Sequence, residues 1–164
     1  MPDALTVAFW VLATIAVGSG LMVVWLRDLF RAALFLATLF LSIAGLYVLL
    51  QADFLAAAQV LIYVGAVSVL LIFAIFLTHN VQQGNPPSSL RLPALALAAL
   101  VFFALVGVFL LTPWSLSTDA PPTTTTTALA DALFGHWVLP FEAASVLLVA
   151  ALIGAIALAR EDSN

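Results

Sequence analysis

Five apolar runs of membrane-spanning length constrain this chain more than any other feature. Each has about the 20 residues that a helix needs to cross the hydrocarbon core of a bilayer. They lie at Ala4–Leu26, Leu29–Leu50, Phe54–Thr78, Leu92–Thr112 and Trp137–Ala159. None alternates polar and apolar residues as a strand of a membrane barrel does. The sequence therefore predicts an all-α, polytopic membrane protein with five transmembrane helices, in which residues 1–164 form a single transmembrane domain.

The composition supports this class and excludes several others. The chain is 65% hydrophobic and 7% charged, more apolar surface than a soluble domain of 164 residues could bury. No basic segment precedes the first run, so we expect no cleavable signal. The absence of cysteine excludes disulfides and iron–sulfur clusters ligated by this chain. We find no phosphate-binding glycine loop, nucleophile elbow, metal-ligand spacing or basic patch for nucleic acid.

The distribution of charge predicts the orientation in the membrane. There is no lysine, and with five spans all four arginines fall on one side: Arg27, Arg31, Arg91 and Arg160. The opposite side carries Asp3, Asp53, Asp119 and Asp131. The positive-inside rule then places the N-terminus outside and the C-terminus in the cytoplasm. The arginines of the first inner loop are interpreted as topology and headgroup anchors, or as contacts to acidic groups of an adjoining subunit.

The two histidines and the two longer loops add little chemistry. His79 and His136 fall on opposite sides, which excludes a shared metal or haem, and both are interpreted as interfacial. The inner loop at 79–91 is rich in Pro, Gly and Ser, and the outer loop at 113–135 contains a threonine run. Ala128–Phe134 is expected to form a short interfacial helix. Small or polar residues in every span indicate a subunit packed among other membrane proteins.

The third span carries the most unusual residues: Gln59, Tyr63, Gly65 and Ser68. On a regular α-helix, Gln59 and Tyr63 are four residues apart and share one face, while Gly65 and Ser68 share another. The polar pair could bridge helices by hydrogen bonds or hold a short water chain. Gly65 is a candidate site for a π-bulge or kink. The alternative, favoured on the residues alone, is that Gly65 serves only helix packing.

Glu142 is the one acidic residue expected inside a span. An intramembrane carboxylate indicates a proton path or a buried partner. The alternative depends on where the fifth helix begins. A start near Leu139 would put Pro140 at its first position and Glu142 in its first turn, where a carboxylate complements the helix dipole. Ser145, three residues further, could hydrogen-bond Glu142 in either case.

Three segments resemble subunit J of respiratory complex I, the NuoJ and NdhG family. ADFLAAAQVLIYVGAVSVLLIFAIFL (52–77) is similar to the family's third transmembrane helix, and RAALFLATLFLSIAGLYVLL (31–50) to the preceding one. LPFEAASVLLVAALIGAIALARED (139–162) is similar to its last helix. The outer loop with its threonine run matches no pattern of the family.

The resemblance implies a function for the whole chain. It implies a membrane-arm subunit of a proton-pumping NADH or ferredoxin:quinone oxidoreductase, with no catalytic residue, redox centre or metal of its own. FMN or ferredoxin input, iron–sulfur clusters and quinone would belong to other subunits. The implied partners are the A-, H-, K- and N-type membrane subunits. The implied location is an inner (cytoplasmic) or other energy-transducing membrane.

The resemblance also implies a role for the third helix. Family members carry a π-bulge near the positions of Gly65–Val69, and Tyr63 matches their tyrosine. The implied gating set is Tyr63, Gly65, Ala66, Val67, Ser68 and Val69. Resolving a π-bulge rotates the helix beyond it by about 100°, one residue's step, which could exchange a wet face for an apolar plug such as Leu70 or Phe73. Gln59 and Glu142 remain candidates for a proton path or a helix anchor, and a Pro-Phe-Glu sequence occurs in some photosynthetic-type members.

Two other classes of protein remain open at this point. The first is a membrane subunit of a related membrane-bound hydrogenase or cation antiporter complex, which uses similar small helical subunits. The second is a stand-alone small transporter. The absence of lysine and the near absence of intramembrane charge argue against the second class.

Overall fold

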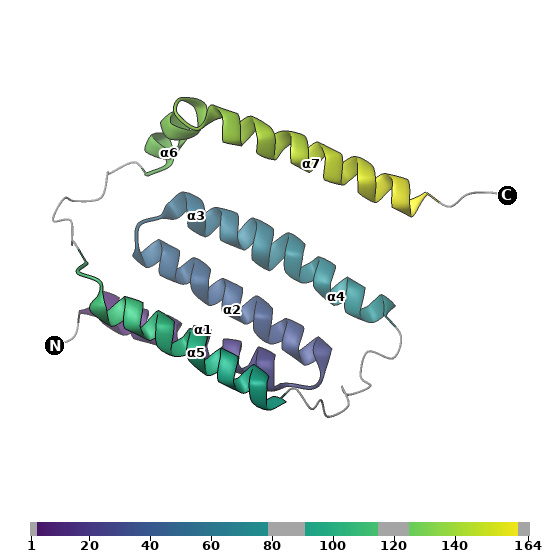
Figure 1. Ribbon diagram of the computed structural model, residues 1–164. Coiled ribbons are helices and arrows are strands. Elements are labelled where there is room, and N and C mark those ends of the chain that lie inside the picture. Colours follow the sequence, from purple (N-terminus) through teal and green to yellow (C-terminus); the bar gives the residue numbers. More distant parts are fainter. Residues whose placement is uncertain (1–2, 79–90, 115–124, 161–164) are drawn as a thin grey trace.

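The computed structural model describes residues 3–78, 91–114 and 125–160, all of them in helices or short connections. The elements are α1 (Ala4–Trp25), α2 (Leu29–Leu49), α3 (Asp53–Ala58), the π-helix η1 (Gln59–Val67), α4 (Ser68–Leu77), α5 (Arg91–Leu111), α6 (Thr125–Phe134) and α7 (Val138–Ala159). The segments α3, η1 and α4 run on as one rod (Figure 1). Five helices in the described residues are long and apolar enough to cross a membrane, which confirms the predicted spans to within a residue at each end.

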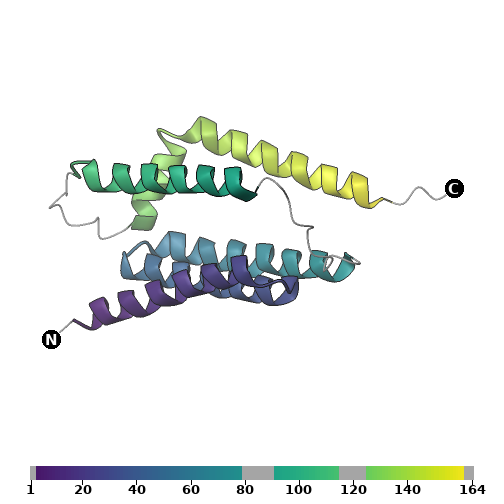
Figure 2. The ribbon, with the colours of Figure 1, turned by 60° about the horizontal axis from the view of Figure 1, so that its bottom comes forward.

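Three of the five spans pack into one unit. Helix α2 lies in the middle, with α1 on one side and the α3–η1–α4 rod on the other (Figures 1 and 2). The apolar side chains buried in this unit are all small: Ala32, Ala33, Ala44 and Ala56. At Gly45 an added Cβ would lie 3.0 Å from the Cδ atoms of Leu12, so α1 and α2 approach closely there. Small residues at such contacts are typical of helix packing in membranes.

The turn between α1 and α2 is fixed by Asp28. Its Oδ1 accepts hydrogen bonds from the amides of Phe30 (3.0 Å) and Arg31 (3.2 Å), so it caps the N-terminus of α2. Its Oδ2 lies 3.4 Å from Nε of Arg31. Arg27 lies in the connection, outside either helix. Asp28 therefore has a structural role that we did not foresee.

The turn between α2 and α3 forms by a different device. Gln51 adopts a left-handed conformation with φ of 57°. Its amide bonds the carbonyl of Val48, and the amide of Ala52 bonds the carbonyl of Tyr47. These two bonds form a Schellman motif, which ends a helix and reverses the chain. Glycine is the usual residue at this left-handed position, and here glutamine occupies it.

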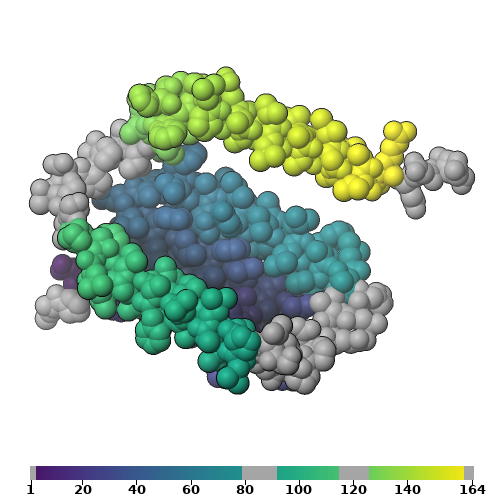
Figure 3. Space-filling view, viewed as in Figure 1, coloured from purple at the N-terminus to yellow at the C-terminus, as the bar shows by residue number. Residues whose placement is uncertain are grey.

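The remaining two spans lie apart from the packed unit. Within the described residues, α5 contacts no other helix, and α7 contacts only α6, which in turn touches α3 (Figure 2). In the space-filling view α7 stands clear of α4 along most of its length (Figure 3). Helix α6 includes the predicted short helix at Ala128–Phe134 and begins three residues earlier. These two spans leave apolar faces that lipid or other subunits must cover.

The element order separates the charges as predicted. The α1–α2 connection with Arg27, the start of α5 at Arg91 and the end of α7 before Arg160 lie at one end of the helices (Figure 1). The opposite end carries the described acidic residues Asp3, Asp53 and Asp131. His79 and Asp119 lie outside the described residues. Which end faces the cytoplasm stays a prediction.

Candidate functional site

The candidate site is the contact of the third span with α2. Two of its polar side chains are buried there: Gln59 is 8% exposed and Ser68 is 3% exposed. Outside the rod itself, α2 is the only described helix that contacts η1 or α4, so α2 provides this burial. The structure therefore brings Gln59 and Ser68 to the same neighbour.

Phe40 of α2 joins two of the predicted residues. Nε2 of Gln59 lies 3.5 Å from the Phe40 carbonyl oxygen, a long hydrogen bond between the two helices. The Tyr63 ring meets the Phe40 ring edge-on, with centroids 5.3 Å apart. Tyr63 is nevertheless 47% exposed, so its ring covers Phe40 from the side. Phe40 was not foreseen, because nothing in the sequence distinguishes it from the other phenylalanines of the spans.

The third span is a π-helix over Gln59–Val67. At its end, both the amide and the hydroxyl of Ser68 bond the carbonyl of Tyr63, five residues earlier, and the hydroxyl bond is 2.7 Å long. The segment begins earlier than the expected Gly65–Val69. Tyr63, Gly65, Ala66 and Val67 lie inside it, whereas Ser68 and Val69 belong to α4.

The π-helix changes one of the two predicted faces. We expected Gly65 and Ser68 on one face, but Gly65 is exposed and Ser68 is buried. This prediction assumed 3.6 residues per turn, and a π-helix takes more residues per turn. Gln59 and Tyr63, also expected on one face, differ in exposure, but both contact Phe40 of α2. The division of this span's residues into buried and exposed therefore differs from the one predicted from the sequence.

Gly65 is not required by crowding in this chain. A Cβ added there would lie 3.4 Å from the carbonyl oxygen of Val60, which is ordinary van der Waals contact. A role of Gly65 in forming the π-helix stays a prediction.

Glu142 does not lie in the first helical turn. Because α7 begins at Val138, Pro140 is its third residue and Glu142 its fifth, so the expected first-turn position of Glu142 is wrong. The side chain is exposed. The Ser145 hydroxyl donates to the backbone carbonyl of Glu142 at 2.7 Å and leaves the carboxylate free of that contact. Neither role proposed for this carboxylate is tested by the geometry.

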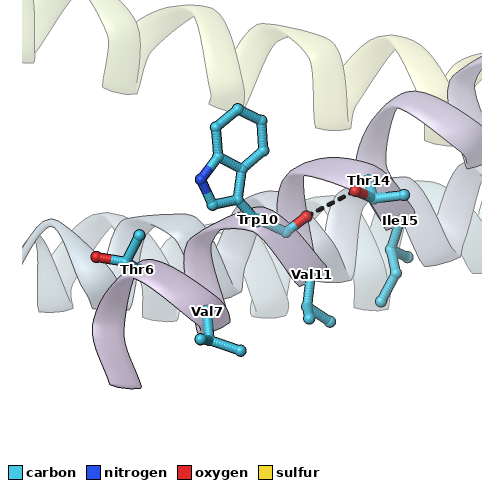
Figure 4. Close-up of a pocket in the computed structure, with 6 residues that line it drawn as sticks. All are labelled: Thr6, Val7, Trp10, Val11, Thr14 and Ile15. Atoms are coloured by element: carbon cyan, nitrogen blue, oxygen red, sulfur yellow. Dashed lines mark hydrogen bonds between the residues drawn. The ribbon is translucent and has the colours of Figure 1, made fainter. Parts of the chain in front are cut away.

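The described hollows of the chain are apolar. A groove of about 710 Å³ runs between α2 and the rod, lined by Leu41, Ala44, Gly45, Val48, Ala56, Ala57, Val60 and Leu61. A second groove, of about 500 Å³, lies on α1 (Figure 4). The Thr14 hydroxyl in this groove bonds the Trp10 carbonyl at 2.7 Å. The described residues contain no group of three potential metal ligands. What the site contains is a π-helical segment of an apolar span with two buried polar side chains, Gln59 and Ser68.

The described helices define a class of small polytopic helical membrane protein, in which the third span carries a π-helix with buried polar side chains. Comparison with known proteins identifies the family. The sequence profile described as NADH-ubiquinone/plastoquinone oxidoreductase chain 6 matches residues 19–158. The chain belongs to this family of complex I-like membrane subunits.

Several relatives match nearly the whole chain. NAD(P)H-quinone oxidoreductase chain 6 of Leptolyngbya boryana is 46% identical over 95% of this chain and 80% of its own length. The protein of the same name from Synechocystis sp. is 44% identical over 95% of this chain and 81% of its own length. F(420)H(2) dehydrogenase subunit J of Methanosarcina mazei is 38% identical, over 97% of this chain and 93% of its own length. The predicted family is confirmed.

Proposed function

We propose that this chain is a membrane-arm subunit of a proton-pumping, complex I-like quinone oxidoreductase and couples quinone reduction to proton translocation. It would do so without a redox centre, among A-, H-, K- and N-type subunits, with its N-terminus outside. Family membership supports this proposal. The relatives are named for NAD(P)H and F(420)H(2), so the electron donor of this complex is to be sought among these and ferredoxin.

The gate in this proposal is the π-helix η1. The observation that carries it is a run of i→i+5 turns in the middle of a membrane span, at the span's contact with α2. Conversion to an α-helix would rotate α4 by about 100° for each residue by which the turns tighten. Leu70 and Phe73 are exposed side chains of α4 that such a rotation would carry around the helix. The rotation would open or close a hydrated path beside the span.

Deletion of Ala66 tests the gate directly. The deletion shortens η1 by one residue and favours regular α-helical turns without adding any side chain. We expect the complex to assemble and to reduce quinone, with the number of protons pumped per electron reduced severalfold in proteoliposomes. Ala66→Gly keeps the chain length and serves as the matched control. Full pumping after the deletion would contradict a gating role for η1.

The rival assignment to a hydrogenase or antiporter complex is less well supported, because the matching family is that of quinone oxidoreductases. Mild-detergent extraction, native gel separation and mass spectrometry of the band that contains this chain distinguish the two. We expect quinone-binding and antiporter-like subunits together with an electron-input arm. A band with hydrogenase subunits, or the chain alone, would overturn the proposal.

A further inference from the structure

We propose that Gln59 and Ser68 act as a pair that holds the third span in its π register. They are positioning residues, because they decide which face of α4 meets α2. The inference deepens the proposed gate and rests on it only for its effect on pumping. The register itself is a structural quantity that can be measured separately.

The spacing of the pair is incompatible with burial in a regular helix. Gln59 and Ser68 are nine residues apart, which in an α-helix of 3.6 residues per turn is two and a half turns. One residue would face α2 and the other would face the opposite side. In i→i+5 turns, which take more residues, nine residues make about two turns and return to the same side. Both residues are in fact buried, and α2 is the helix that buries them.

The hydrogen bond of Ser68 reports the same register. Five other hydroxyl groups in or at the end of described helices bond the carbonyl four residues earlier, and that of Ser145 bonds the carbonyl three residues earlier; the five are those of Thr14, Thr38, Ser42, Thr78 and Thr112. The Ser68 hydroxyl instead reaches the carbonyl five residues earlier. The Ser68 amide also donates to this carbonyl, that of Tyr63, and it shares its hydrogen with the carbonyl of Gly65, three residues earlier. The hydroxyl bond thus matches the i→i+5 bond of the Ser68 amide.

Tightening of the π-helix toward an α-helix would bring a side chain larger than that of Ser68 to the contact with α2. If the turns of η1 tightened by one residue, about half of the way to a fully regular helix, Val67 would take the place of Ser68 against α2. Val67 is now 40% exposed, and the site of Ser68 leaves 3% of that residue exposed. A β-branched valine in a space closed around serine would force repacking.

The other end of the pair resists rotation as well. Gln59 cannot turn away from α2 without losing its bond to the Phe40 carbonyl. Its amide would then lie in hydrocarbon without that partner, which is costly. With Gln59 held at one end and Ser68 fitted at the other, the nine residues between them are held in wider turns.

The experiment exchanges the two side chains that compete for the contact. The double variant Val67→Ser/Ser68→Val has the same composition and places the small hydroxyl residue where a third span tightened by one residue would need it. The intact complex in lipid nanodiscs would be imaged, and the fractions with π and α register in the third span counted. We expect the ratio of α to π to rise about tenfold. An unchanged ratio would overturn the inference.

Two further variants protect the experiment from a trivial failure. Val67→Ser alone leaves Ser68 in place and should also raise the α fraction, so it replaces the double variant if that complex does not assemble. Ser42→Ala removes another buried serine hydroxyl, one in ordinary α-helical geometry on α2, and should leave the register unchanged. A register shift in Ser42→Ala equal to that in the exchange would contradict a specific role for the pair.

Pumping measured on the same samples separates this inference from the proposed gate. A changed register with unchanged pumping would support the pair and contradict the gate. An unchanged register, together with loss of pumping on deletion of Ala66, would contradict the pair and support the gate.

Discussion

At the scale of single residues, the polar side chains of the spans differ in what they indicate. Most hydroxyl groups bond their own helix one turn back and need no partner beyond it, so a serine or threonine in an apolar span is weak evidence of function. Gln59 and Ser68 differ, because the first bonds a neighbouring helix and the second bonds out of α register. Asp28 differs in another way, because its carboxylate caps the N-terminus of α2.

We predict that Asp28→Ala destabilises the packed unit by about 1 kcal/mol, because the amides of Phe30 and Arg31 lose their acceptor. The measurement is the temperature at which this chain dissociates from the detergent-solubilised complex, which should fall. Asp3→Ala is the control, since Asp3 precedes α1 and its side chain makes no capping bond. Equal losses in both variants would contradict the capping role.

For Glu142 we predict an anchoring role at the outer end of α7. Glu142 is exposed and is the fifth residue of α7. Glu142→Gln should therefore leave the ratio of protons pumped to electrons transferred within about twofold of the unchanged complex, a barrier difference under about 0.5 kcal/mol. A tenfold loss in this ratio, with quinone reduction retained, would instead identify Glu142 as part of a proton path.

At the scale of elements, the packed unit depends on close approach of its helices. Glycine and alanine line the contacts on α2, and the hydrogen bond from Gln59 and the ring of Tyr63 both meet Phe40 on the same helix. Helix α2 thus packs against α1 on one side and against the π-helix on the other. A disturbance of the α1–α2 contact is expected to reach η1 through α2.

We predict that Gly45→Leu destabilises this unit by about 1–3 kcal/mol, because even a Cβ there would lie 3.0 Å from Leu12. The second-site change Leu12→Ala should restore part of the loss by vacating that space. Dissociation temperatures of the two single variants and the double variant form a cycle that isolates the pair. Strictly additive losses would show that the two residues do not share this contact.

At the scale of the whole molecule, the chain is an incomplete bundle. Within the described residues α5 touches no other helix and α7 touches only the short α6, so neither of these two spans packs against another span of the chain. Lipid can cover an apolar helix, but a subunit of a larger membrane complex has neighbours for such faces. This arrangement agrees with the family to which the chain belongs.

The absence of cysteine allows a direct test of the predicted orientation. Single substitutions His136→Cys and Ser163→Cys would be labelled with a membrane-impermeant maleimide in right-side-out vesicles. We expect His136→Cys to react from outside and Ser163→Cys only after permeabilisation, because the arginine-bearing end should face the cytoplasm. Labelling is read on this chain alone after separation of the subunits. The reverse pattern would contradict an outside N-terminus.

The sequence by itself determined the number of spans, their bounds and the separation of charge between their ends. The physical reason is that hydrocarbon solvates no backbone polar group, so each apolar run must form a helix of fixed minimum length. The expectation of Glu142 in a first turn failed because Pro140, expected at the first position of the helix, is the third residue of a helix that begins at Val138. That is the usual precision with which helix ends can be placed.

Only the tertiary structure decided which polar residues of the third span lie together. Faces follow from the number of residues per turn, which differs between α- and π-helical turns. In our proposal α2 selects between the two kinds of turn, through the carbonyl of Phe40 and the narrow space around Ser68. Neither is visible in the sequence, since Phe40 lies nineteen residues before Gln59 and any helical periodicity assumes the register that this contact changes.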